Sequence, residues 1–276
     1  MKNMLLRYLV AVIAIPLIVL LLVYAPSWMF NLFVTVVMLV VYGEWLGLLR
    51  NMKVAAPTFL GLIMCLMLEG GIWGFAVFKD GLFLYLSIVL TILGSAIFGI
   101  INQHHDIKQK FLGGGAMMMG MLLCAWGGGS LILVRETTCV PDGRYWILLQ
   151  FAMTWGGDAG AMHFGKWFGK HKLTPIISPK KTVEGLLGGM MTSIVFGVLL
   201  HHLAAFNTPR WHIYLLAPIT VLLAHVGDLT ASMAKRVAGV KDSSRLIPGH
   251  GGFLDRFDNL LLTAPMIYIY IKAFIV

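Results

Sequence analysis

The chain has 276 residues, of which 59% are hydrophobic and only 12% are charged, and its mean hydropathy is +0.85. A soluble domain is typically about 45–50% apolar and about 25% charged, so the composition excludes an ordinary soluble protein and indicates a polytopic membrane protein. The net charge of +9 favours anionic lipid or a polyphosphate as partner and not nucleic acid, because no soluble domain is present to carry a nucleic-acid site.

Apolar runs of about 20 residues, the length that crosses a bilayer as a helix, recur along the chain. We expect nine such spans and therefore an all-α fold. The spans are residues 8–25, 28–49, 57–78, 81–101, 112–134, 144–164, 186–206, 212–234 and 254–275. The first run is long for a secretory signal and lacks a clear cleavage site, so we expect it to be retained as a span. Acidic residues interrupt the sixth, eighth and ninth runs.

Lysine and arginine are distributed unevenly over the predicted loops. A cytoplasmic N-terminus places most of the 21 basic residues on the cytoplasmic side, as the positive-inside rule requires. We therefore expect a multi-pass protein of the cell (inner or plasma) membrane, with a single membrane domain over residues 1–276. Residues 1–145 are mostly plain spans, while residues 146–276 carry the chemistry and two basic cytoplasmic loops. The 31 glycines permit a homodimer without requiring one.

Four aspartates near the cytoplasmic ends of predicted spans are candidate functional groups, because ionisable groups at membrane depth are costly. They are Asp158, Asp228, Asp255 and Asp258. Helical spacing places Ser232, Lys235 and Arg236 on the same face as Asp228. Mg²⁺ is usually held by one or two carboxylates together with substrate phosphates, and basic side chains bind phosphate. The pattern therefore indicates phosphoryl chemistry on a lipid, with the active site on the cytoplasmic face.

Two acidic residues of the first half, Glu44 and Glu69, lie outside this concentration of charge. We expect them to make structural interhelical hydrogen bonds or to lie near a membrane surface, and we predict no functional role for them. The histidines lack cysteine partners at zinc-ligand spacing, and no soluble nucleotide-binding loop such as GxxxxGK[ST] is present.

Residues 232–258 form a spaced pattern of charges, glycines and one proline. It consists of Ser232, Lys235, Arg236, Lys241, Asp242, Pro248, His250, Gly251, Gly252, Asp255, Arg256 and Asp258. This pattern resembles the signature of the CDP-diacylglycerol synthases, also called phosphatidate cytidylyltransferases. An upstream stretch with Asp158, Lys166, Lys170, Ser178, Lys181 and Thr182 is similar to a second motif of that family. The resemblance is strong over about residues 150–265 and general over the first half. Met162, Ala231 and Ala234 depart from the usual family residues.

The resemblance implies a Mg²⁺-dependent transfer of the cytidylyl group of CTP to phosphatidate, giving CDP-diacylglycerol and pyrophosphate. On this basis we expect Asp228 and Asp255 to hold Mg²⁺, with Asp158 and Asp258 as further ligands or neighbouring acids. A second, monovalent cation is compatible with the same set. The residues expected to bind the phosphates of CTP and lipid are Lys181, Lys235, Arg236, Lys241 and Arg256. Further substrate contacts are expected from Ser178, Thr182, Ser232 and His250.

Two other functions stay open on the sequence alone. A CTP-dependent lipid phosphotransferase resembling a polyprenol kinase would share the Mg²⁺ and the basic loops, but it would release CDP instead of pyrophosphate. A transporter is disfavoured, because the acids and basic loops gather in one half of the chain and on one membrane face.

Overall fold

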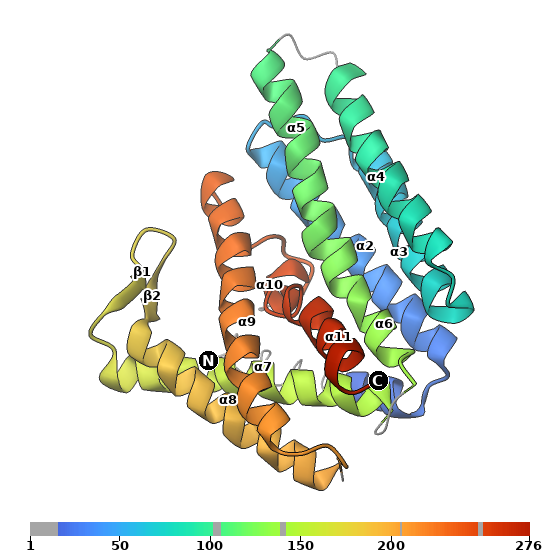
Figure 1. Ribbon diagram of the computed structural model, residues 1–276. Coiled ribbons are helices and arrows are strands. Elements are labelled where there is room, and N and C mark those ends of the chain that lie inside the picture. The colour runs from blue at the N-terminus through green and yellow to red at the C-terminus, as the bar shows by residue number, and fades with distance from the viewer. Residues whose placement is uncertain (1–15, 102–105, 139–141, 205, 248–250) are drawn as a thin grey trace. The chain divides into compact units, whose positions relative to one another are not determined.

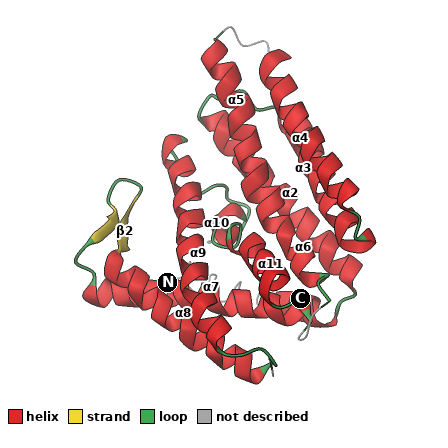
Figure 2. Cartoon of the chain, in the orientation of Figure 1, coloured by secondary structure: helices red, strands yellow, loops and turns green. Residues whose placement is uncertain are grey.

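The computed structural model describes residues 16–101, 106–138, 142–204, 206–247 and 251–276. Its regular elements are almost all helices, with one short β-hairpin (Figures 1 and 2). The mainly helical fold predicted from the apolar runs is confirmed. The chain divides into two compact units, one formed by residues 1–136 with 234–257 and the other by residues 137–233 with 258–276. The single membrane domain, with its parts 1–145 and 146–276, stays a prediction, and the signature segment 234–257 packs with the N-terminal helices.

The first unit consists of long apolar helices that lie side by side (Figure 1). They are α2 (Ser27–Asn51), α3 (Thr58–Phe78), α4 (Gly81–Ile101) and a continuous stretch of α5 (Ile107–Gly120), the π-helix η1 (Met121–Gly128) and α6 (Gly129–Arg135). These helices match the second to fifth predicted spans. The first predicted span lies largely outside the described residues, although residues 16–24 are helical. The short α10 (Leu254–Phe257) packs on α2.

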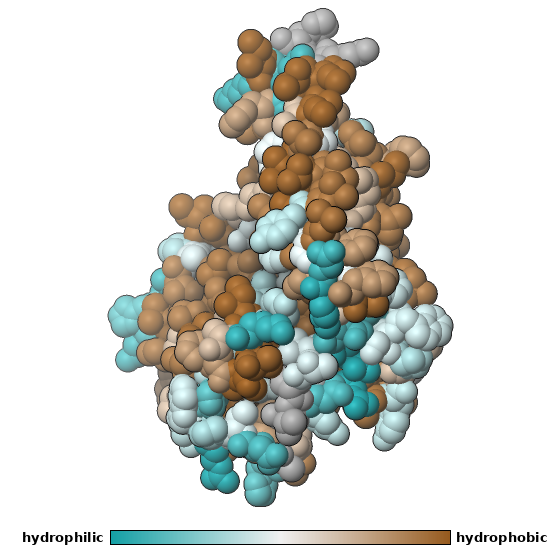
Figure 3. Space-filling view, turned by 45° about the vertical axis from the view of Figure 1, so that its right-hand side comes forward, coloured by the Kyte–Doolittle hydropathy of each residue, from teal (hydrophilic) through white to brown (hydrophobic). Residues whose placement is uncertain are grey.

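Small residues allow these helices to approach one another closely. A Cβ atom on Gly71 of α3 would overlap Ser87 of α4, and a Cβ atom on Gly128 would overlap Met38 of α2. Such contacts replace the hydrophobic driving force that is missing between helices in lipid. Outward-facing positions of the same helices are apolar, and Figure 3 shows apolar side chains dominating the upper part of the view, where α4 and α5 lie.

The second unit contains α7 (Gly143–Phe168), the hairpin strands β1 (Lys172–Thr174) and β2 (Ser178–Thr182), α8 (Val183–Leu203) and α11 (Thr263–Phe274). Helix α9 (Trp211–Val237) begins in this unit, and its end, from Ala234 on, belongs to the first unit. Helices α7 and α8 pack along most of their length through glycines, and Thr192 of α8 donates a 3.0 Å hydrogen bond to the Gly156 carbonyl of α7.

A small antiparallel hairpin occupies the region predicted to be the first basic cytoplasmic loop. Lys172 pairs with Thr182 and Thr174 pairs with Ser178. The Glu184 carboxylate closes the base of the hairpin, because it accepts the Lys170 amide at 3.0 Å and contacts the His171 ring nitrogen Nδ1 at 2.6 Å. The hairpin therefore holds its lysines in a defined place between α7 and α8.

Among the residues that the structure describes, six helical segments are long and apolar enough to cross a membrane, namely α2, α3, α4, residues 107–135, α8 and α9. These helices indicate a membrane protein. Helix α7 is not among them, because polar residues such as Asp158 and Lys166 lower its hydropathy. The count of nine spans and the orientation of the N-terminus stay predictions.

The ninth predicted span, residues 254–275, is not one continuous helix. The four-residue α10 is followed by turns at 258–262 and then by α11, whose 12 residues extend only about 18 Å, against a hydrocarbon core of about 30 Å. Two hydrogen bonds of Asn259 accompany the break, and one of them reaches a residue 101 positions earlier in the chain. The Asp258 carboxylate accepts the Asn259 amide at 2.9 Å, and the Asn259 side chain donates to Asp158 at 2.6 Å, so these residues bond to partners outside a helical ladder.

Candidate active site

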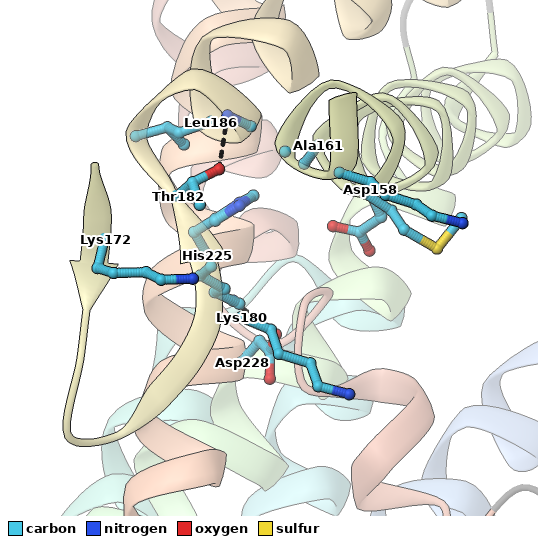
Figure 4. Close-up of a pocket in the computed structure, with 13 residues that line it drawn as sticks. Asp158, Ala161, Lys172, Lys180, Thr182, Leu186, His225 and Asp228 are labelled. Carbon is cyan, nitrogen blue, oxygen red and sulfur yellow. Dashed lines mark hydrogen bonds and ion pairs between the residues drawn. The ribbon is translucent and has the colours of Figure 1, made fainter. Parts of the chain in front are cut away.

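The second unit contains a pocket of about 530 Å³ that is lined by apolar and charged side chains. Its charged or titratable lining residues are Lys166, Lys172, Lys180, Lys181, Asp158, Asp228 and His225. Figure 4 shows Lys172 of the hairpin and Asp158 of α7 reaching into the pocket from opposite sides. Two of the predicted metal ligands, Asp158 and Asp228, therefore share one cavity with the predicted phosphate-binding residue Lys181.

Helical spacing explains how α7 and α9 present their pocket residues. Asp158, Met162 and Lys166 follow one another at intervals of four on α7, so they lie on one helix face, and all three line the pocket. His225 and Asp228 are three residues apart on α9 and line it from that helix. Met162, which departs from the family pattern, thus stands inside the cavity.

An ion pair fixes Asp228 at the pocket wall. Lys181 Nζ lies 2.6 Å from Asp228 Oδ2, and the Ser232 hydroxyl donates to Oδ1 at 3.1 Å from one helical turn further along α9. The Asp228 side chain is 35% exposed, so it still faces the cavity. Ser232 therefore orients Asp228, which agrees with the predicted shared face of α9.

The first turn of α8 also borders the pocket. Thr182 caps this helix, with its Oγ1 accepting the Gly185 amide at 3.1 Å, and both residues line the cavity (Figure 4). Helix N-termini favour anions, because their amide groups point outward and the helix dipole is positive there. Together with the four lysines this favours a phosphate-bearing ligand.

A second cluster of predicted site residues lies in the first unit. Lys235 Nζ lies 2.5 Å from Asp255 Oδ1, and the two side chains are only 9% and 7% exposed. The other oxygen, Asp255 Oδ2, accepts the Ser243 amide at 2.9 Å, the Ser243 hydroxyl at 3.0 Å and the Gly252 amide at 3.0 Å. Asp255 thus holds together the described residues between α9 and α10, 238–247 and 251–253, which are called the signature loop below.

The charge state of Asp255 follows from these partners. Burial alone raises the pKa of the Asp255 carboxyl, but the hydrogen bonds from Lys235, Gly252 and Ser243 outweigh burial, so its pKa lies below the ordinary value. The group is therefore a carboxylate at neutral pH.

The neighbouring Gly251 has φ +81°, a left-handed conformation that favours glycine, and its carbonyl accepts the Ile247 amide at 2.9 Å.

Glu44 of α2 also binds the signature loop. Its carboxylate accepts the Ser243 and Ser244 hydroxyls at 2.7 and 2.6 Å. It also accepts the amides of Phe253 and Leu254 at 3.0 and 2.8 Å. The prediction of structural hydrogen bonds is confirmed for Glu44. The two buried oxygens of Glu69 have no hydrogen-bond partner among the described residues, so for this residue the other alternative, a position near a membrane surface, stays a prediction.

The remaining predicted residues occupy different places. Ser178 lies in β2 opposite Thr174 and is not a lining residue of the pocket. Arg236, Lys241 and Arg256 are exposed on the first unit. Asp258 is buried in the second unit, and its Oδ1 accepts the Asn259 amide. His250 lies outside the described residues. Within the described residues no three His, Cys, Asp or Glu side chains gather as a metal site, so the four-aspartate set stays a prediction.

Sequence reasoning did not include several lining residues among the expected site residues. They are Lys166, Lys172, Lys180 and His225. A signal existed for two of them, since Lys166 shares a helix face with Asp158 and His225 shares one with Asp228. No signal placed Lys172 and Lys180, because the hairpin that positions them was predicted only as a loop.

Apolar helices together with a basic, carboxylate-bearing pocket at a helix N-terminus define a membrane protein suited to a phosphorylated ligand. The model of the cytidylyltransferase family matches residues 5–274, and the chain belongs to that family.

Curated relatives carry the name phosphatidate cytidylyltransferase. The protein of Staphylococcus haemolyticus is 44% identical over 128 residues, which cover 46% of this chain and 49% of the relative. The proteins of Staphylococcus saprophyticus and Staphylococcus aureus are each 40% identical over 149 residues, covering 54% of this chain and 56% of the relative. The chain thus spans about half the length of the curated relatives it matches.

Proposed function

We propose that the chain transfers the cytidylyl group of CTP to phosphatidate, giving CDP-diacylglycerol and pyrophosphate in phospholipid biosynthesis. Family membership and the names of the staphylococcal relatives support this proposal. The observation that carries it is the pocket of the second unit, where four lysines and the first turn of α8 surround Asp158 and Asp228. Such a pocket suits a ligand with several phosphates, because basic groups outnumber the acids.

The chemistry needs little more than alignment and charge neutralisation. An oxygen of the lipid phosphate forms a bond to the α-phosphorus of CTP, and the bond from that phosphorus to the β-phosphate oxygen breaks, so pyrophosphate leaves. The lipid phosphate is already an anionic nucleophile, so no general base is required. The main obstacle is repulsion between two polyanions, which Lys172, Lys180 and Lys181 relieve while holding them in line.

We propose Mg²⁺ as the cofactor, alone or with a monovalent cation. Asp158 and Asp228 fit it, because they are hard oxygen donors on one pocket that also suits phosphates. The metal role of Asp255 rests on the family pattern alone, since its Oδ1 contacts Lys235 and its Oδ2 accepts the amides of Ser243 and Gly252. When bound, Mg²⁺ would neutralise charge on the transferred phosphoryl group. Asp258, Lys235, Arg236, Lys241, Arg256, Ser178 and His250 keep the metal or phosphate roles predicted from the family pattern.

Product analysis with the purified protein tests the proposal. The protein is incubated with phosphatidate, CTP labelled in the cytidine and at the terminal phosphate, and Mg²⁺. The expected products are CDP-diacylglycerol and pyrophosphate. Release of CDP with a newly phosphorylated lipid would instead indicate a kinase. No turnover with any phosphatidate species refutes the assignment. Asp228→Asn and Asp255→Asn should each abolish turnover, whereas Asp80→Asn, at an exposed helix start, should not.

We further propose that the site faces the cytoplasm of a bacterial cell, with the protein in the plasma membrane. The concentration of lysines on the hairpin supports this orientation through the positive-inside rule. A cysteine introduced at the exposed Ile176, in a background without Cys65, Cys124 and Cys139, tests it. An impermeant maleimide should label this cysteine in inverted vesicles but not in intact cells. A homodimer stays a prediction from the glycine content.

A further inference from the structure

The Glu44 carboxylate is one of the most heavily hydrogen-bonded acids among the described residues, yet it belongs to the plain N-terminal helices. It lies about two turns before the end of α2, more than 200 positions before two of its four partners in the chain. The residue is 6% exposed. All four partners come from the segment 243–254, which lies within the signature stretch.

We propose that Glu44 is a positioning residue that holds the signature loop in its working shape, so that Asp255 is presented correctly. The inference rests on the proposed cytidylyl transfer for its effect on rate, but not for the geometry of the loop. Glu44 touches no predicted substrate group. It acts through Ser243, whose hydroxyl lies 2.7 Å from Glu44 Oε2 and 3.0 Å from Asp255 Oδ2 and can donate its one hydrogen to either carboxylate. One serine therefore links the two carboxylates directly.

The two carboxylates bind neighbouring amides of the same loop. Asp255 binds the amides of Ser243 and Gly252, and Glu44 binds those of Phe253 and Leu254. Three consecutive amides, at 252, 253 and 254, thus end on two carboxylates. Since a buried amide without an acceptor is costly, the loop keeps this shape only while both acids are present.

Glycine at position 252 allows the close approach. A Cβ atom there would overlap both the Ser243 hydroxyl and the Glu44 carboxylate. Gly252 is buried, so a side chain has no open space to move into. The glycine at position 252 is thus explained by its contacts with Ser243 and with Glu44, a residue outside the signature.

Glutamine at position 44 is a sharp perturbation, because each Glu44 oxygen accepts one hydroxyl and one backbone amide. Whichever oxygen becomes NH₂, one backbone amide then faces another donor and loses its acceptor. The size of the side chain is unchanged. The matched control is Glu69→Gln, since Glu69 is a fully buried acid of α3 in the same unit and contacts none of these donors.

The experiment measures hydrogen–deuterium exchange and steady-state kinetics on the purified full-length protein in detergent. With Glu44→Gln, exchange of the amides at 252–254 should rise about tenfold or more, while the α3 and α4 amides keep their protection. The kcat should fall by about 10- to 100-fold with KM for CTP and phosphatidate changed by less than about threefold. Ser244→Ala, which removes one donor and leaves both amides bound, should give a smaller effect of the same kind.

The exchange measurement tests the role of Glu44 in the loop, and the kinetic measurement tests its effect on cytidylyl transfer. Unchanged exchange at 252–254 overturns the proposal whatever the activity. Faster exchange with an unchanged kcat, or a loss of activity equal to that of Glu69→Gln, also overturns it. If the wild-type protein shows no cytidylyl transfer, the proposed function has failed, and the exchange comparison alone decides whether Glu44 holds the loop.

Discussion

Replacing Lys235 with methionine removes the ammonium group from Asp255 and keeps most of the apolar length of the side chain. The pair is 2.5 Å apart, with side chains 9% and 7% exposed, so water cannot replace the lost partner. Removing one member of a buried pair typically costs about 3–5 kcal/mol, because the other charge stays buried without compensation. Three donors remain on Asp255 Oδ2, so we expect the lower end, about 3 kcal/mol.

A double-mutant cycle measures this interaction directly. Unfolding in detergent is followed for the wild type, Lys235→Met, Asp255→Asn and the double variant. Because the double variant has no unpaired carboxylate, its loss should be smaller than the sum of the single losses by about 2 kcal/mol. Lys241→Met, at an exposed position of the same unit, is the control and should change stability by less than about 0.5 kcal/mol. Additive losses at Lys235 and Asp255 would refute the argument.

Three further predictions follow from single contacts. Gly252→Ala should lower activity at least tenfold, because the added Cβ overlaps Ser243, and a displaced site typically loses about 10²-fold. The control Gly70→Ala, whose Cβ meets open space, should leave activity unchanged in the same assay. Thr182→Ala should lower the free energy of unfolding by about 1 kcal/mol through loss of the α8 cap, and serine at that position should restore it. The pKa of Asp255 is lower folded than unfolded, so its stabilising effect should be complete above about pH 5 and decline as the pH falls through the folded pKa. Melting curves of wild type and Asp255→Asn should therefore begin to approach each other below about pH 4 and meet only below the folded pKa, and a constant difference down to pH 3 would contradict the assignment.

The long helices could be predicted because hydropathy and length alone determine a membrane span. The predicted run 81–101 coincides with α4, and 57–78 differs from α3 by one residue. The ninth run could not be predicted correctly, because its composition is that of a span while Asn259 donates hydrogen bonds to Asp258 and to Asp158. Those partners lie about 100 positions apart in the chain, so no local pattern reveals the break.

In the candidate site, too, contacts within one helix could be predicted from the sequence, and contacts between distant segments could not. Spacing on one helix correctly placed Ser232 beside Asp228. The partner of Asp228 across the pocket, Lys181, was predicted to bind phosphate but not to pair with this acid. The pairing depends on the hairpin register, which sequence spacing did not indicate.

Glu44 shows why a signature can be incomplete as a description of a site. The pattern from Ser232 to Asp258 contains residues of the loop itself, including Asp255 and the glycines that allow its turn. The residue that holds the loop from outside is separated from it by 199 positions or more, so its spacing to the signature carries no information. Its carboxylate, together with the Ser243 hydroxyl, nevertheless leaves Gly252 no room for a side chain. A glycine can therefore be required at one position because of a residue that is distant in the sequence. Gly252 is such a case, because a side chain there would overlap Glu44.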